Sequence, residues 1–69
     1  MADVRIALNG EGRSFSAPFE LLGLLATLGL EPLAVAVERN RENMLRDEFD
    51  SLELQDGDQL EIVRLVGGG

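Results

Sequence analysis

The chemistry available in this sequence is confined to carboxylates, a few hydroxyl groups, arginines and the chain termini. Its 69 residues include no cysteine, histidine, tryptophan or tyrosine, and all six basic residues are arginine. These absences remove thiol and amine nucleophiles, imidazole bases, disulfides and the usual soft metal ligands. We therefore expect a chain that is not an enzyme by itself and that binds no metal or cofactor of its own.

The glycine run at the end of the sequence is the first candidate for a reacting group. Gly67, Gly68 and Gly69 can extend roughly 10 Å beyond a preceding strand, at about 3.3 Å per residue. Because glycine has no Cβ, such a segment can follow a narrow channel, and the carboxylate of Gly69 can then reach the active site of another protein. An inert, frayed tail is the alternative, because chain ends are commonly disordered.

The strand expected over residues 59–66 is the candidate docking surface. If Leu60 faces the core, the alternation of a strand points Val63 and Leu65 to the opposite face. Exposed aliphatic side chains on a small domain indicate a docking surface, so we predict that Val63, Leu65 and the neighbouring Arg64 bind a partner. The alternative is that these are scattered surface residues without a function.

Two aspartates near the last strand form a candidate metal site on residue type alone. However, the residues after Asp56 and Asp58 lack the oxygen-rich spacing of a calcium loop, and Leu60 stands where another ligand is needed. We therefore expect a plain turn at Asp56-Gly57-Asp58 and no metal site.

The overall charge excludes one class of partner. Thirteen acidic residues against six basic residues give a net charge of -7, whereas binding to nucleic acid requires a basic face. Neither a signal peptide nor a membrane span is expected, since the start carries charged residues and the most apolar stretch, residues 21–30, is too short. We expect a cytoplasmic protein that binds neither nucleic acid nor membrane.

The elements that must position these groups follow from the hydrophobic pattern. Residues 3–9 alternate as a strand, Asn9-Gly10 predicts a hairpin turn, and residues 13–17 form the returning strand. Pro18 suits the first turn of a helix that carries a leucine stripe and ends at Gly29.

The second half of the chain is expected to complete a sheet. Residues 33–38 predict a third strand that ends at Asn40, and residues 41–50 predict a short strand followed by a helical turn. The expected anchors of residues 41–50 are Met44, Leu45 and Phe49, and the sequence also suggests a minor strand at residues 52–54.

This order of elements predicts an α+β fold. Pairing the first and last strands in the middle of a mixed sheet of four to five strands, covered by one main helix, gives the β-grasp arrangement of ubiquitin-like domains. We expect one domain over residues 1–66, followed by the flexible glycine tail at residues 67–69.

The segments that carry a family resemblance extend over nearly the whole chain. They are Leu8-Asn9-Gly10-Glu11, Leu24-Leu25, Leu28-Gly29-Leu30, Ala36-Val37-Glu38, Asn40, Arg46 with Phe49, Leu54-Gln55-Asp56-Gly57-Asp58, Glu61-Ile62-Val63 and Gly68-Gly69. In this order and length, the sequence resembles the ubiquitin-like sulfur carrier proteins of thiamine biosynthesis, the ThiS family.

The resemblance implies a mechanism carried out by partner enzymes. An E1-like adenylyltransferase (ThiF-like) would use MgATP to convert the Gly69 carboxylate into an acyl-adenylate. Sulfur from the persulfide of a cysteine desulfurase, or from another persulfide source, would displace AMP and leave a thiocarboxylate on Gly69. A thiazole synthase (ThiG-like) would accept that sulfur for the thiazole ring of thiamine.

Two other readings use the same fold. The small subunit of molybdopterin synthase is also a sulfur carrier that ends in Gly-Gly, but the residues before its glycines differ from the segment Val63-Arg64-Leu65-Val66 found here. The chain could also be a ubiquitin-like modifier or a binding domain without sulfur transfer.

Overall fold

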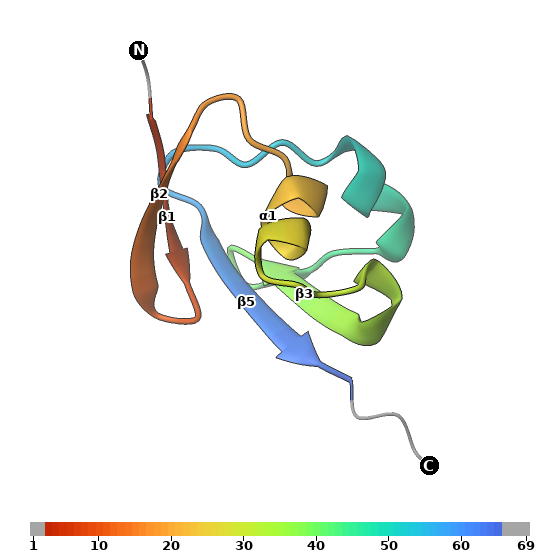
Figure 1. Cartoon of the computed structure of the whole chain (residues 1–69). Helices are drawn as coiled ribbons and strands as arrows, with labels where there is room; N and C mark the ends of the chain where they lie inside the picture. The colour runs from red at the N-terminus through yellow and green to blue at the C-terminus, as the bar shows by residue number, and fades with distance from the viewer. Residues whose placement is uncertain (1–2, 66–69) are drawn as a thin grey trace.

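The computed structural model describes residues 3–65 (Figure 1). The predictions for the glycine tail, Gly67 to Gly69, therefore lie outside the described residues. The elements in chain order are β1 (Asp3–Leu8), β2 (Glu11–Ser16), α1 (Leu21–Thr27), the 3-10 helix η1 (Pro32–Ala34), β3 (Val35–Arg39), β4 (Glu42–Asn43), the 3-10 helix η2 (Arg46–Ser51) and β5 (Gln59–Arg64).

The first hairpin forms where the sequence predicts it. Asn9 and Gly10 both adopt positive φ, 50° and 85°, which is the geometry of a tight two-residue turn. Because the turn contains only these two residues, Leu8 pairs with Glu11, and β2 begins two residues earlier than expected. The antiparallel pairing of β1 with β2 is confirmed.

The helix is shorter than the prediction, which placed Pro18 in its first turn. The segment before Leu21 is extended, because it pairs with the chain that follows η2: Leu54 N–H donates to Phe19 O at 2.8 Å and Leu21 N–H donates to Leu52 O at 3.0 Å. The minor strand expected at residues 52–54 is accordingly a single bridge to this segment. The predicted helix end is confirmed, with Gly29 at a φ of 71°.

The region around η2 differs from its prediction in one anchor. Phe49 is buried and Met44 packs partly against the core, as expected, but Leu45 is 68% exposed. Leu45 lies at the junction of β4 and η2, where its N–H is held at 2.9 Å by the carboxylate of Glu48. This contact at the start of η2 fixes the backbone of Leu45, and the side chain is left in solvent.

The third strand begins later than expected. Residues 33–38 were predicted to form it, but Pro32–Ala34 is the 3-10 helix η1, and β3 starts at Val35. A proline at the start of η1 sets the φ of a helical turn, and this favours a turn over a strand there. Leu33, on η1, is consequently 74% exposed.

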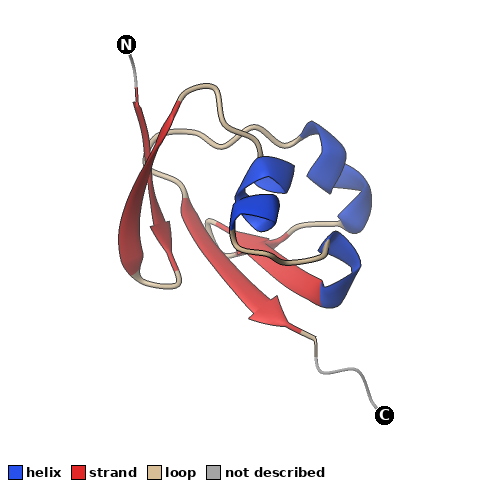
Figure 2. Ribbon diagram, viewed as in Figure 1, coloured by secondary structure: helices blue, strands red, loops and turns tan. Residues whose placement is uncertain are grey.

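The five strands form one mixed sheet in the order β2-β1-β5-β3-β4. β5 lies in the middle, parallel to β1 and antiparallel to β3. All the helical segments lie on one side of this sheet (Figure 2). The core between the layers consists of Val4, Ile6, Leu8, Leu21, Leu24, Leu25, Val35, Val37, Phe49, Leu54, Leu60 and Ile62. The predicted α+β, β-grasp fold is confirmed, and its other sheet face carries no helix within residues 3–65.

The turn between β3 and β4 contains a strained residue. Asn40 and Arg41 both have positive φ, 52° and 71°, and asparagine tolerates this conformation better than arginine does. We expect Arg41→Gly to raise the free energy of unfolding by about 0.5–1 kcal/mol, measured by urea denaturation, because glycine lacks the Cβ that strains this conformation. Glu42→Gly, at the next residue and inside β4, is the control and should lower stability. Destabilisation by Arg41→Gly would contradict the assignment of strain to this turn.

Candidate functional site

The exposed face of β5 carries the predicted aliphatic pair. Val63 is 59% exposed and Leu65 is 51% exposed, whereas Leu60 and Ile62 are buried. The alternation predicted for this strand is therefore confirmed. Burial of Leu60 and Ile62 against the helix layer requires Val63 to face the side of the sheet without helices.

The three predicted docking residues lie at the end of β5 but not on one face: Arg64 is opposite the core residue Val35, and so points to the helix side of the sheet, whereas Val63 points to the other side. Val63 and Arg64 are paired to Ala36 and Val35 of β3. Leu65 lies one residue beyond the strand, but its N–H still donates to Ala34 O at 2.8 Å. The backbone is thus held by neighbouring elements up to the last described residue. Val63, Arg64 and Leu65 form one exposed segment, which ends one residue before the glycine run in the sequence.

A side chain of the first turn also positions β5, which sequence reasoning missed. Asn9 Oδ1 accepts the N–H of Ile62 at 2.8 Å, and Asn9 Nδ2 donates to the carbonyl of Ile62 at 3.3 Å. Because β1 ends at Leu8, this amide continues the pairing of β5 where the backbone of β1 turns away. The only sequence signal was Asn9-Gly10, which indicates a turn and says nothing about a distant strand.

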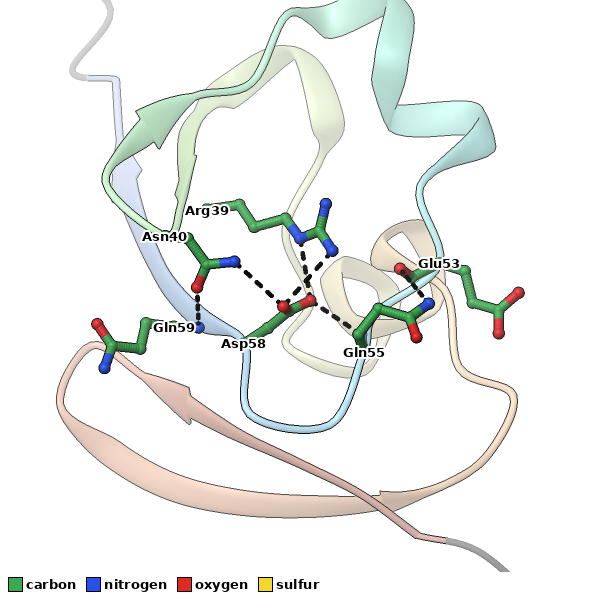
Figure 3. Close-up of polar contacts among 6 residues, drawn as sticks. All are labelled: Arg39, Asn40, Glu53, Gln55, Asp58 and Gln59. Carbon is green, nitrogen blue, oxygen red and sulfur yellow. Dashed lines mark hydrogen bonds and ion pairs between the residues drawn. The ribbon is translucent and has the colours of Figure 1, made fainter.

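The start of β5 is fixed by an ion pair between the buried Asp58 and the partly buried Arg39 (Figure 3). Asp58 Oδ2 accepts from Arg39 Nε at 2.9 Å and from Gln55 N–H at 2.8 Å, and Asp58 Oδ1 accepts from Asn40 Nδ2 at 3.2 Å. Asn40 in turn accepts from Gln59 N–H at 2.9 Å. These contacts join the turn before β5 to the end of β3.

The turn predicted at Asp56-Gly57-Asp58 is confirmed, but the prediction missed the structural role of Asp58. Gly57 has a φ of 91°, as a tight turn requires, and among residues 3–65 no cluster of acidic side chains could hold a metal ion. Asp58, however, is 5% exposed and paired rather than solvated. Spacing along the chain could not show this, because Arg39 lies 19 residues away.

The pKa of Asp58 is lowered from its ordinary value of 3.8. Burial raises the pKa of this carboxyl, but the opposing effects are together larger: the hydrogen bonds from Gln55, Arg39 and Asn40, and the charge of Arg39. The carboxylate is thus the form that the folded protein stabilises.

This shift predicts a loss of stability in acid. Because the native pKa lies below the unfolded value, the contribution of Asp58 is fully present above pH 3.8 and disappears as the pH falls through the native pKa. We expect the difference in free energy of unfolding between wild type and Asp58→Asn to shrink below pH 3.8 in urea titrations. The exposed Asp50→Asn serves as the control, and a difference that stays constant with pH would contradict the shift.

The described residues contain no helix long and apolar enough to cross a membrane. The reacting group predicted from the sequence, the carboxylate of Gly69, lies outside these residues. Within residues 3–65, the structure therefore offers a strand that leads toward the glycines and an exposed face beside it.

Comparisons with known proteins agree on one family. The ThiS family matches residues 6–69. The chain is 48% identical over 46 residues to the sulfur carrier protein ThiS of Bacillus subtilis, covering 67% of this chain and 70% of that protein. It also matches the crystal structure of the thiamine biosynthesis protein ThiS from Geobacter metallireducens, with a TM-score of 0.78 and 29% identity over 96% of this chain and all of that one.

A second kind of relative is much longer. The chain is 42% identical over 66 residues to a thiazole synthase of Paramagnetospirillum magneticum, which covers 96% of this chain and 20% of that protein. The chain thus spans about a fifth of this relative's length. Since the ThiS match extends over nearly the whole sequence and the β-grasp fold agrees with the solved ThiS structure, the chain belongs to the ThiS family.

Proposed function

We propose that this chain is a sulfur carrier for thiamine biosynthesis and that its reacting group is the carboxylate of Gly69. The observation that supports this most directly is the family match, which continues through the glycine run to residue 69. The relative from Bacillus subtilis is named a sulfur carrier protein, and other relatives are named thiazole synthases. In this proposal the chain is a co-substrate, and partner enzymes carry out the catalysis.

The proposed chemistry begins with activation, because a carboxylate is a poor electrophile at neutral pH. An oxygen of the Gly69 carboxylate attacks the α-phosphorus of MgATP on an E1-like adenylyltransferase, and pyrophosphate leaves. The terminal sulfur of a persulfide then attacks the carbonyl carbon, and AMP leaves. A thiol cleaves the resulting S–S bond, which gives a thiocarboxylate and a disulfide. A thiazole synthase is the proposed acceptor of the sulfur.

The chain's own contribution is to present the tail from a fixed strand. β5 is held on one side by β1 and Asn9 and on the other side by β3, so its end has a defined direction. Val63, Arg64 and Leu65 are the proposed docking residues. Exposed apolar side chains of this kind commonly form the centre of an interface.

This proposal is tested by ATP–pyrophosphate exchange with an adenylyltransferase of this pathway. The wild-type chain should stimulate the exchange, and Val63→Glu should raise the KM for the chain about tenfold or more, because it places a charge in an apolar contact. Leu45→Glu is the matched control, since Leu45 is also exposed but lies directly before η2 and not on β5. A wild-type chain that stimulates no exchange would refute the carrier function, whereas equal KM values for both variants would refute only the docking surface.

A further inference from the structure

The strand β2 forms a long free edge on one side of the sheet. It is the outermost strand there and pairs with β1 alone, over six consecutive residues and without a bulge (Figure 1). Because a free edge can pair with other chains, proteins commonly shorten an edge strand, bulge it or place proline or lysine on it. The opposite edge, β4, is only two residues long. β2 has none of these protections.

The pairing with β1 determines which main-chain groups of β2 are free. The turn at residues 9–10 contains two residues, so Leu8 and Glu11 form the first hydrogen-bonded pair of the hairpin. The N–H and C=O groups that alternate with this pair then point away from β1, and they belong to Gly12, Ser14 and Ser16. All three residues are exposed, and none has a large side chain. The edge therefore offers three donors and three acceptors to another extended strand.

Most antiparallel registers between two copies of β2 contain a conflict. A register centred on Arg13 places this arginine opposite its own copy, and like charges directly opposite each other destabilise a sheet. A register centred on residue 15 brings Pro18, which has no N–H, opposite a free group. A register centred on residue 12 does the same with Gly10, which is held in the turn at a φ of 85°.

A register centred on Ser14 has no such conflict. It pairs Ser14 with the partner's Ser14 and Gly12 with the partner's Ser16, so all the outward N–H and C=O groups of β2 are bonded. Arg13 then lies opposite the partner's Phe15 in a non-hydrogen-bonded pair, where side chains approach most closely. A guanidinium group is attracted to the face of an aromatic ring. The edge of β2 is therefore self-complementary in this register.

The charge of β2 also favours a second copy of the chain as the occupant of this edge. The whole chain has a net charge of -7, but β2 carries one acidic and one basic residue, Glu11 and Arg13, whose side chains lie 3.6 Å apart. The edge is thus neutral on a strongly acidic protein. Two copies that meet through β2 consequently avoid the charge repulsion at short range that other acidic surfaces would cause.

We propose that two copies of this chain associate through their β2 strands, antiparallel and centred on Ser14, to form one continuous sheet. The interface of two strand edges is much smaller than the roughly 1,600 Å² of a standard stable complex, so we expect a weak dimer with a Kd of roughly 0.1–1 mM. The proposal goes beyond the carrier function and does not depend on it. β1 separates β2 from β5 in the sheet, so the dimer leaves Val63 free.

The dimer is tested by sedimentation equilibrium up to about 1 mM protein. The average mass of wild type should rise with concentration from one chain toward two, and more so at high salt, which screens the repulsion between acidic chains. Ser14→Pro removes the central outward N–H but no bond to β1, and it should raise Kd about tenfold or more. Ser14→Ala keeps the N–H and is the matched control, with a Kd close to that of wild type.

A cysteine at the centre of the interface gives a second test that does not depend on proline. The chain has no cysteine of its own, and residues paired at the axis have Cα atoms about 5.5 Å apart, within the range of a disulfide. Ser14→Cys should therefore form a disulfide-linked dimer at least about tenfold faster than Ser51→Cys, an exposed position on η2.

A wild-type chain that stays monomeric at about 1 mM would overturn the inference, and so would equal rates of cross-linking for the two cysteine variants. Association of a folded Ser14→Pro variant with the wild-type Kd would also overturn it, because the interface would then lie elsewhere. Pyrophosphate exchange should be unchanged in Ser14→Pro. A failure of the carrier function in that assay would leave the measured dimer standing, so the two proposals fail separately.

Discussion

Deletion of Gly69 is expected to reduce formation of the thiocarboxylate by at least about 100-fold. The shortened chain still ends in a glycine carboxylate, but that group lies about 3.3 Å short of its position in the full chain. A misplacement of about 1 Å can already cost about 100-fold in rate, because the reacting atoms must meet in line. The rate is measured by single-turnover formation of the acyl-adenylate and of its sulfur product.

Two comparisons distinguish a loss of the reacting group from damage to the fold. The unfolding free energy of the deletion variant should equal that of wild type, since the described core ends before the glycines. Gly69→Ala retains the length and the carboxylate but adds a Cβ, and we expect a smaller loss than the deletion causes. Full activity of the deletion variant would show that Gly69 is not the reacting residue.

Replacement of Asp58 by alanine is expected to cause the largest loss of stability. The change removes the acceptor of Arg39 Nε, of Gln55 N–H and of Asn40 Nδ2, and it leaves a partly buried guanidinium without its ion pair. Loss of such a network costs about 2–4 kcal/mol. A domain below about 80 residues rarely has more than about 3–5 kcal/mol in total, so the variant should be largely unfolded near body temperature.

Urea denaturation at neutral pH measures this loss. Asp50→Ala removes an exposed acid from η2 and should stay within about 0.5 kcal/mol of wild type. Arg39→Ala should be less damaging than Asp58→Ala, because the aspartate would keep its contacts with Gln55 and Asn40. An Asp58→Ala variant as stable as the Asp50→Ala control would show that the Arg39–Asp58 pair does not hold β5 to β3.

Most of the fold could be predicted because its signals are local. The alternation of Val4, Ile6 and Leu8 predicted β1, and the Asn9-Gly10 pair predicted its turn. Two wrong predictions have local causes, the Glu48 carboxylate next to Leu45 and Pro32 before β3, whereas the wrong start of the helix depends on distant partners. The backbone around Phe19 is extended because it bonds to residues 52–54, and no nearby residue indicates this.

The sequence likewise predicted the part of the candidate site that depends on local signals. The exposure of Val63 and Leu65 follows from the burial of their neighbours, so strand alternation was sufficient. The contacts that fix the position of β5 could not be predicted from the sequence, because Asn9 and Ile62 are 53 residues apart.

The central claim is tested most directly by the intact mass of the 69-residue chain after incubation with the adenylyltransferase, MgATP and a persulfide source. We expect a mass increase equal to the exchange of one oxygen for one sulfur. Treatment with a thiol-alkylating reagent should then convert this product into its alkylated adduct. Fragmentation should place the change on Gly69. An unchanged mass, with an adenylyltransferase that modifies its own carrier under the same conditions, would contradict the assignment of this chain as a sulfur carrier.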